Sequence, residues 1–335
     1  MITKDEHRQE KSRKKFALPG SSAHYAPSLA FTITHMRLEV EPDLAARTIS
    51  CRQELQVEAV QQETAELELD ACELDFISVT MGGEKKLAFR ALDDKLTIKL
   101  PRALKEGEKT AIAIEYSAKP RKGFYFVGPD SHYPDKRPEA WTQGETVEAS
   151  HWFPCIDHPQ VKFSSEMVIT VPEGYTAISN GRLVKTEKGN DGGDDKKWKY
   201  YWFEGNPHPA YLTSIVVGKY VEINEGSLYY YVPPELAHDA KRSFDRTGDM
   251  VRFFEEYLGT KYPYEKYSQV CVQDFVYGGM ENSSCTTLTL DTLHDAKAHI
   301  DFSSDYLVSH ELAHQWFGDL VTCRDWQHIW LNEGF

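Results

Sequence analysis

The sequence predicts an α+β chain of more than one domain, with a β-rich first part and a second part that mixes strands with helices. Between about residues 30 and 220, short runs alternate apolar and polar side chains, as at residues 96–100 and 111–116. Alternation with a period of two is typical of half-buried antiparallel strands. After residue 220 the apolar residues are spaced as in helices. The change of pattern predicts domains at residues 25–220 and 221–335, after a tail at 1–24.

Two of the expected β elements have well-marked features. The first alternates with polar residues and ends at residues 42–43; its inward positions are Thr34, Met36, Leu38 and Val40. The second is a long hairpin, in which residues 182–188 and 196–203 flank a turn rich in glycine and aspartate at 189–195. Because no helix follows these glycines, they indicate a loop and not a phosphate-binding cradle.

The second part of the chain begins with a predicted helix over residues 235–258. Pro233 and Pro234 precede it and Gly259 follows it, which are typical start and stop signals. A strand is expected around residues 268–272, followed by a glycine turn and then by further helices.

Composition narrows the range of partners. The 335 residues include 38 basic and 52 acidic ones, for a net charge of −14. Nucleic-acid binding requires a basic surface, so we expect no nucleic-acid partner. The six cysteines lack C-x-x-C spacing, which predicts reduced thiols in place of a zinc knuckle or a disulfide framework.

The N-terminal segment is charged and leads into no apolar run. Basic and acidic residues mix up to about residue 15, and Leu18-Pro19-Gly20 follows. This pattern lacks the apolar core of a signal peptide. No stretch reaches the ~18 apolar residues of a membrane helix. We therefore expect a frayed tail to about residue 24 on a soluble, cytoplasmic protein without membrane insertion.

The strongest functional signal is His310-Glu311-Leu312-Ala313-His314. Residues four apart share one face of a helix, so both imidazoles can reach one metal ion, with Glu311 beside them. Glu333 follows His314 after 18 intervening residues. Two histidines and one carboxylate leave a fourth position open on a tetrahedral zinc ion, which is typical of a catalytic site.

The helical context supports this interpretation. Ser303 and Ser304 offer N-cap groups, Asp305 places negative charge in the first turn, and Gly318 is a plausible end. One stripe at helical spacing predicts that the histidines lie on the core-facing side; it comprises Tyr306, His310, Ala313, His314 and Phe317. A second stripe predicts another helix that places a carboxylate in line with apolar residues; it comprises Trp326, Ile329, Trp330 and Glu333.

A second constellation lies upstream at residues 278–282, Gly-Gly-Met-Glu-Asn. The two glycines follow an aromatic run and allow the backbone to bend or a ligand to approach closely. Taken alone, this segment is equally well a strand that ends in a turn.

Together these blocks resemble the zinc aminopeptidases of the aminopeptidase N and leukotriene-hydrolase family, a gluzincin group. The shared features are Gly-x-Met-Glu-Asn, His-Glu-x-x-His and a glutamate 19 positions after the second histidine. Residues 330–334, 142–145 and 153–157 also resemble that family, and the blocks stand in the same order. The resemblance runs from about residue 25 to the end. It implies an N-terminal antiparallel β-sandwich, the saddle domain, followed by the first part of a thermolysin-like catalytic domain.

The resemblance also implies a metal site and a reaction. His310, His314 and Glu333 would bind one zinc ion, and Glu311 would be the general base that takes a proton from a zinc-activated water. Zinc can lower the pKa of bound water to about 7, which suits amide hydrolysis at neutral pH. The implied enzyme is a metalloprotease that hydrolyses the N-terminal residue of peptides.

The remaining implied residues would bind the substrate, a peptide with a free N-terminus. Glu281 would bind the α-ammonium group, with Glu145 as its partner from the first domain. Gln143 would line the pocket for the first side chain. The backbone at Gly278, Gly279 and Met280 would hydrogen-bond the extended peptide.

One departure from the family concerns the end of the chain at Phe335, two residues after Glu333. Family members continue beyond this point and supply a tyrosine that stabilises the oxyanion. Loss of one such donor can lower turnover roughly 100- to 1,000-fold. We therefore expect the N-terminal part of an enzyme that can be inactive alone.

Three alternatives stay open at this stage. An enzyme of the same scaffold could also hydrolyse a lipid epoxide, although Glu145 favours the peptidase. An endopeptidase is disfavoured because Glu281 and Glu145 would block longer N-terminal extensions. A catalytically silent zinc-binding module would retain zinc without turnover. The preferred N-terminal residue and the oligomeric state are not predicted.

Overall fold

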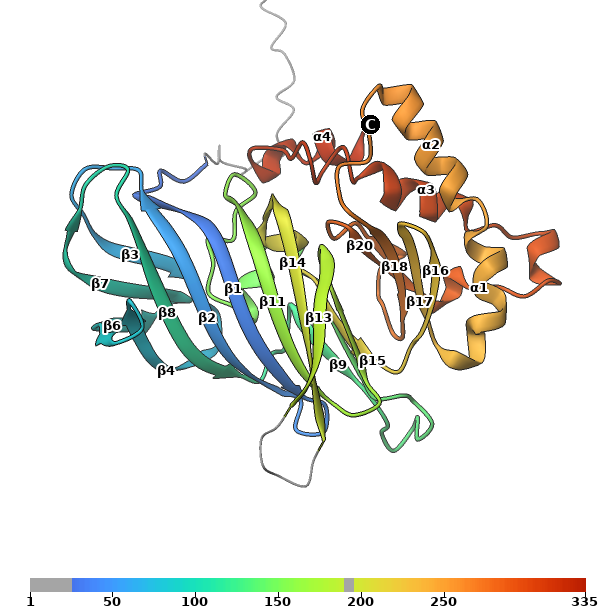
Figure 1. Cartoon of the computed structure of the whole chain (residues 1–335), viewed down its shortest axis with the longest axis horizontal. Coiled ribbons are helices and arrows are strands. Elements are labelled where there is room, and N and C mark those ends of the chain that lie inside the picture. Colours follow the sequence, from blue (N-terminus) through green and yellow to red (C-terminus); the bar gives the residue numbers. More distant parts are fainter. Residues whose placement is uncertain (1–25, 190–195) are drawn as a thin grey trace, which may run out of the picture.

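The computed structural model describes residues 26–189 and 196–335. The tail predicted at residues 1–24 and most of the turn predicted at 189–195 lie outside these ranges. The β-rich part occupies the left and middle of the view in Figure 1, and α1, α2 and α3 lie at its right. The predicted multidomain α+β fold is confirmed. The predicted boundary at residue 220 falls between two sheets, after β15 and before β16.

The largest sheet has eight strands in the order β13-β14-β11-β1-β2-β8-β4-β5. Most neighbours in it are antiparallel, as expected, but β1 and β11 are parallel. Its strands are β1 (Phe31–Asp43), β2 (Thr48–Ala59), β4 (Leu74–Met81), β5 (Lys85–Lys86), β8 (Lys109–Ala118), β11 (Lys162–Pro172), β13 (Arg182–Gly189) and β14 (Lys197–Pro209).

Two smaller sheets complete the β-rich part. One has the order β3-β7-β6 and lies at the end of the molecule farthest from the helices; its strands are β3 (Thr64–Asp70), β6 (Phe89–Leu92) and β7 (Lys95–Leu104). The other has the order β12-β15-β10-β9; its strands are β9 (Phe124–Val127), β10 (Glu139–Thr142), β12 (Thr176–Ser179) and β15 (Ile215–Gly218).

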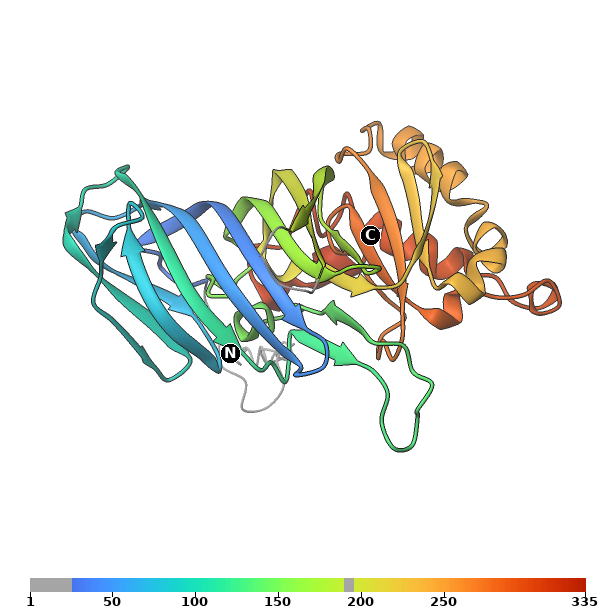
Figure 2. The same cartoon turned by 60° about the horizontal axis from the view of Figure 1, so that its bottom comes forward.

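The second part contains a five-stranded mixed sheet in the order β16-β17-β18-β20-β19. Its strands are β16 (Val221–Glu225), β17 (Leu228–Val232), β18 (Tyr267–Val272), β19 (Gly279–Met280) and β20 (Cys285–Thr289). The helices are α1 (Ala237–Phe244), α2 (Thr247–Leu258), α3 (Asp305–Ala313) and α4 (Trp330–Glu333). In Figure 2 the two parts lie beside each other along the long axis of the molecule.

The predicted alternation in β1 is correct from Met36 onward. Met36, Leu38 and Val40 are buried, but Thr34 is not. The register with β2 shifts between Ile33 and His35, so Thr34 lies in a bulge and Ile33 takes the buried position. The predicted hairpin is present as the antiparallel pair β13 and β14.

The prediction of one helix over residues 235–258 was wrong, because the chain bends at Asp245 and Arg246. α1 packs on Tyr230 through Phe244, whose ring stacks on it at 5.0 Å between centroids. α2 packs instead near Trp316, through residues such as Phe254. Both halves have helical periodicity, but they pack mainly against different apolar clusters. One straight helix could not contact both clusters.

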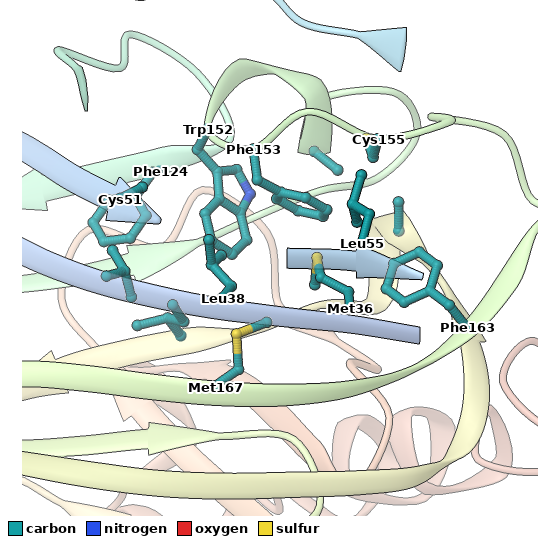
Figure 3. Close-up of a cluster of buried hydrophobic side chains, with 14 of the residues drawn as sticks. Met36, Leu38, Cys51, Leu55, Phe124, Trp152, Phe153, Cys155, Phe163 and Met167 are labelled. Atoms are coloured by element: carbon teal, nitrogen blue, oxygen red, sulfur yellow. The ribbon is translucent and has the colours of Figure 1, made fainter. Parts of the chain in front are cut away.

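The core of the β-rich part surrounds the segment at residues 149–156, as Figure 3 shows. Trp152 and Phe153 are fully buried and meet edge to face at 4.5 Å between ring centroids. Cys155 is buried beside them. The six cysteines all lie in the described ranges and are free thiols. None of the helices within those ranges has the length and apolar character that a bilayer crossing needs.

His208 is a buried polar group in the wall of this core. Its Nε2 lies 2.9 Å from the hydroxyl of Ser165 and its Nδ1 lies 3.1 Å from the carbonyl oxygen of Pro209. Burial lowers the pKa of His208 from 6.5 to about 4, because the charged ring would lose its hydration.

We predict that this histidine makes the fold acid-sensitive. Its pKa is lower in the folded chain, so the unfolded chain binds more protons below pH 6.5 and stability is lost as the pH falls toward 4. The shift corresponds to about 3 kcal/mol. The free energy of unfolding, measured in urea, should fall by this additional amount between pH 7 and pH 4 in the wild type relative to His208→Gln. Equal losses in the two proteins would contradict the prediction.

Candidate metal and substrate site

Helix α3 presents the two histidines at its C-terminal end. Its N-cap is Ser304, whose side chain makes no capping hydrogen bond. The hydroxyl of the preceding Ser303 accepts a hydrogen bond from the Asp305 amide at 3.1 Å. The helix ends at Ala313 with His314 as its C-cap, and Gly318 follows with a φ of 124°. The helix is therefore one turn shorter than its periodicity suggested.

The predicted apolar stripe of this helix was partly wrong. Tyr306 is 82% exposed and the His310 side chain is 40% exposed, whereas His314 is buried. The face that packs into the protein carries Val308, Glu311 and Leu312 instead. The two histidines therefore lie at the edge of the face that packs into the protein. They point into the candidate site and not into an apolar core.

The predicted helix around Trp326 was also interrupted. A 3₁₀ turn at Trp326–His328 is followed by the four-residue helix α4, which ends at Glu333. Trp330 is 58% exposed, and the Glu333 side chain is 42% exposed. Glu333 is therefore neither buried nor part of an apolar stripe, and it faces the histidines.

His310, His314 and Glu333 converge on one point. The two Nε2 atoms lie 3.2 Å apart, and Glu333 Oε2 lies 3.8 Å from His310 Nε2 and 3.5 Å from His314 Nε2. The His314 Nδ1–H group donates to the Phe317 carbonyl oxygen at 3.0 Å, which leaves Nε2 free to act as a ligand. Three ligand atoms within 4.8 Å of one another, two imidazoles and one carboxylate, fit a zinc ion.

Glu311 lies beside these three side chains in a buried position. It is 3% exposed, and its Oε2 has no hydrogen-bond partner among the described residues. Burial raises the pKa of Glu311 well above its usual value, and the carboxylate of Glu281 raises it further. A Cβ added to Gly279 would overlap the Glu311 carboxylate, so the glycine is required for this close approach.

A second group of acidic residues adjoins the first. Oxygen atoms of Glu145, Glu281 and Glu333 lie within 4.8 Å of one another. Glu281 is 4% exposed and its Oε1 has no partner within the described part of the chain. Burial, followed by the charges of Glu281 and Glu333, raises the pKa of Glu145 to about 8. Carboxylates held this close fit a cationic group placed between them.

These groups border a pocket of about 490 Å³ at the junction of the two parts of the chain. Its lining consists of Gln143, Glu145, Thr146, Tyr277, Gly279, Met280, Ile329 and Glu333. The Gln143 amide donates to Met280 Sδ at 3.1 Å, and its Oε1 has no partner among the described residues. The β-rich part therefore supplies one wall and the second part supplies the other.

Two of the predicted substrate-binding residues, Gly278 and Glu281, do not line this pocket. Gly278 packs in the sheet. Its carbonyl oxygen accepts a hydrogen bond from the Thr289 amide at 3.0 Å, and its Cα faces Leu307. Gly279 and Met280 form the edge strand β19, which pairs with β20 on its other side.

Two residues that hold the backbone of the site, Gln315 and Asn180, were not among the residues predicted from the sequence. Gln315 is fully buried; its Nε2 donates to the Glu281 carbonyl oxygen at 2.9 Å and its Oε1 accepts from the Ser284 amide at 2.8 Å. The Asn180 side chain donates to the Ser283 carbonyl oxygen at 2.8 Å. Only the position of Gln315 directly after His314 could have indicated it.

Comparisons with known proteins agree with this architecture. The family model described as "Peptidase M1 N-terminal domain" matches residues 22–212, and "Peptidase family M1 domain" matches residues 242–335. The chain is 35% identical to "Glutamyl aminopeptidase" of Homo sapiens over 204 residues, which are 58% of this chain and 21% of that protein. It is 30% identical to "Probable aminopeptidase 2" of Sulfurisphaera tokodaii over 284 residues, which are 81% and 34% of the two chains.

A third relative, "Aminopeptidase Ey" of Gallus gallus, is 34% identical over 207 residues, with coverages of 58% and 21%. The chain thus spans about a fifth to a third of the length of these relatives. Because the first of the two family models covers more than half of the residues, the chain belongs to peptidase family M1.

Proposed function

We propose that this chain carries the metal site and the amine-recognition site of a zinc aminopeptidase that acts on peptides with a free N-terminus. The observation that carries the proposal is the shared position of Glu333. It lies within reach of both the histidine pair and the carboxylates of Glu145 and Glu281. A metal site and a site for a cation adjoin each other, as the removal of a terminal residue requires.

His310, His314 and Glu333 would hold the zinc ion. When bound, zinc supplies Lewis-acid chemistry, which polarises the scissile carbonyl and makes water more acidic. Glu311 then acts as general base: its carboxylate accepts the proton of the attacking water and delivers it to the leaving amine. Its buried position suits this role, because few other groups compete for the proton.

Glu281 and Glu145 would recognise the substrate's ammonium group. An acylated N-terminus would leave both carboxylates buried without a cation, which is a heavily penalised state. Gln143, Met280 and Tyr277 would form the walls of the pocket for the first side chain. The edge of β19 at Gly279 and Met280 would pair with the extended peptide.

Of three predictions for the proposed function, the first concerns the whole reaction. The zinc-loaded chain should cleave aminoacyl fluorogenic amides that have a free amine and should leave their N-acetylated counterparts intact. Glu311→Gln should lower turnover roughly 100- to 10,000-fold while zinc stays bound. Equal cleavage of acetylated substrates would exclude an aminopeptidase. Bound zinc without turnover on either series would instead indicate an incomplete enzyme or a silent zinc-binding module.

The second prediction concerns ammonium recognition. Glu281→Gln should lower kcat/KM for free-amine substrates by about 10- to 100-fold, because one charged hydrogen bond is lost. Glu148→Gln is the matched control: this carboxylate lies three residues after Glu145 and binds the Tyr125 hydroxyl at 2.9 Å instead of lining the pocket. Activity of the control should be unchanged. A similar loss in both variants would refute the assignment of Glu281.

The third prediction concerns the close approach of Gly279 to the general base. Gly279→Ala should displace the Glu311 carboxylate and lower turnover about 100-fold, with zinc content unchanged. Gly128→Ala is the control, because a Cβ at Gly128 would meet its nearest neighbour, Pro138, at an ordinary 3.8 Å. Full activity of Gly279→Ala would show that the Glu311 position is not essential.

A further inference from the structure

Helix α4 is too short to fix the position of Glu333 by itself. Four residues form a single turn, and isolated turns are unstable in water. Asn332 is the buried residue of this helix, 2% exposed. Its Oδ1 accepts a hydrogen bond from the Cys323 amide at 2.9 Å, and its Nδ2 donates to the Tyr211 hydroxyl at 3.2 Å. Asn332 is therefore the anchor of α4.

Tyr211 belongs to the β-rich part, in the 3₁₀ turn Ala210–Leu212. It is 1% exposed, and its hydroxyl also lies 3.4 Å from the carbonyl oxygen of Gly318, four residues after His314. Its ring meets Trp326 edge to face at 4.9 Å between centroids. A single side chain thus contacts the segments that carry two of the three proposed metal ligands.

The backbone of Tyr211 contacts a third part of the site. Gly144, between Gln143 and Glu145, lies so close that an added Cβ would overlap the Tyr211 carbonyl oxygen. The loop that supplies Glu145 is therefore packed on the same residue that holds α4.

We propose that Tyr211 is a positioning residue of the metal site, which acts through Asn332 to place the Glu333 carboxylate against the histidines. The inference rests on the proposed function in one respect, the assignment of Glu333 as a ligand. Without the hydroxyl, the buried Nδ2 of Asn332 loses its acceptor, and an unpaired buried donor is unfavourable enough to shift a single helical turn. Groups that orient metal ligands typically change metal affinity 10- to 100-fold when removed.

The test is the zinc affinity of Tyr211→Phe, measured by competition with a chromophoric chelator. We expect affinity to fall 10- to 100-fold. Tyr116→Phe is the matched control: Tyr116 is an equally buried tyrosine whose hydroxyl donates to the Trp152 carbonyl oxygen at 3.0 Å, in the core of the β-rich part. Its variant should bind zinc as the wild type does. Wild-type affinity in Tyr211→Phe would overturn the proposal.

A double-mutant cycle separates positioning from general loosening. In a Glu333→Ala background, Tyr211→Phe should change zinc affinity by less than about twofold, because the residue it positions is gone. The visible spectrum of the cobalt-loaded protein should likewise change with Tyr211→Phe only when Glu333 is present. Equal losses of affinity in both backgrounds would overturn the proposal.

Additional variants separate a folding defect from a wrong assignment. If Tyr211→Phe does not fold, as judged by circular dichroism of the metal-free chain, Asn332→Ala breaks the same hydrogen bond from the other end and should give the same background-dependent loss. If Glu333→Ala alone leaves zinc affinity unchanged, the ligand assignment fails, and the proposed function and this inference fall together. A loss in Glu333→Ala with none in Tyr211→Phe overturns only the inference.

Discussion

The structure around His314 depends on one electrostatic constraint, the confinement of several carboxyl groups with little water. Glu281, Glu311 and Asp319 are buried, and burial raises the pKa of each. Burial would lower the pKa of His314, but its hydrogen bond to Glu333 and the neighbouring carboxylates raise it to about 10. Such a site requires positive charge, supplied by protons, by a metal ion or by a bound ammonium group.

The β-rich part contributes to this constraint directly. It supplies Glu145 to the pocket, and it fixes the loop that follows Glu281. Ser284 has a positive φ of 62°, and its hydroxyl accepts a hydrogen bond from the Gly181 amide at 2.7 Å. The buried Lys266 donates to the Ser284 carbonyl oxygen at 3.0 Å. The acidic loop therefore stays in place because both parts of the chain hold it.

The sequence was sufficient to predict those features that depend on local spacing. Residues four apart on a helix must share a face, so His310 and His314 could be paired without a structure. Periodicity could not predict that residues 235–258 pack against two separate apolar clusters. It also could not predict that Thr34 lies in a β-bulge. It also suggested a buried stripe through Tyr306, which is exposed, because spacing defines a face but not what covers it.

Contacts between residues distant in sequence could not be predicted in this way. Tyr211 and Asn332 are separated by more than a hundred positions, and nothing near either residue indicates the other. The sequence did not indicate the role of Gln315 either, since a buried amide gains its role only from the groups that surround it. The substrate-binding role predicted for Gly278 and Gly279 stays a prediction. The contact between Gly279 and Glu311 is a separate feature that the sequence did not indicate.

Glu333 connects these observations, because it belongs to both groups of charges. Its carboxylate lies beside the histidines and also beside Glu145 and Glu281, so a shift of α4 would alter the proposed metal site and the proposed ammonium site together. Two functions that share one carboxylate cannot be tuned independently. A short helix with an exposed tryptophan cannot hold such a group in place by itself. The one buried side chain of this helix, Asn332, is therefore hydrogen-bonded to Tyr211 in the core of the β-rich part.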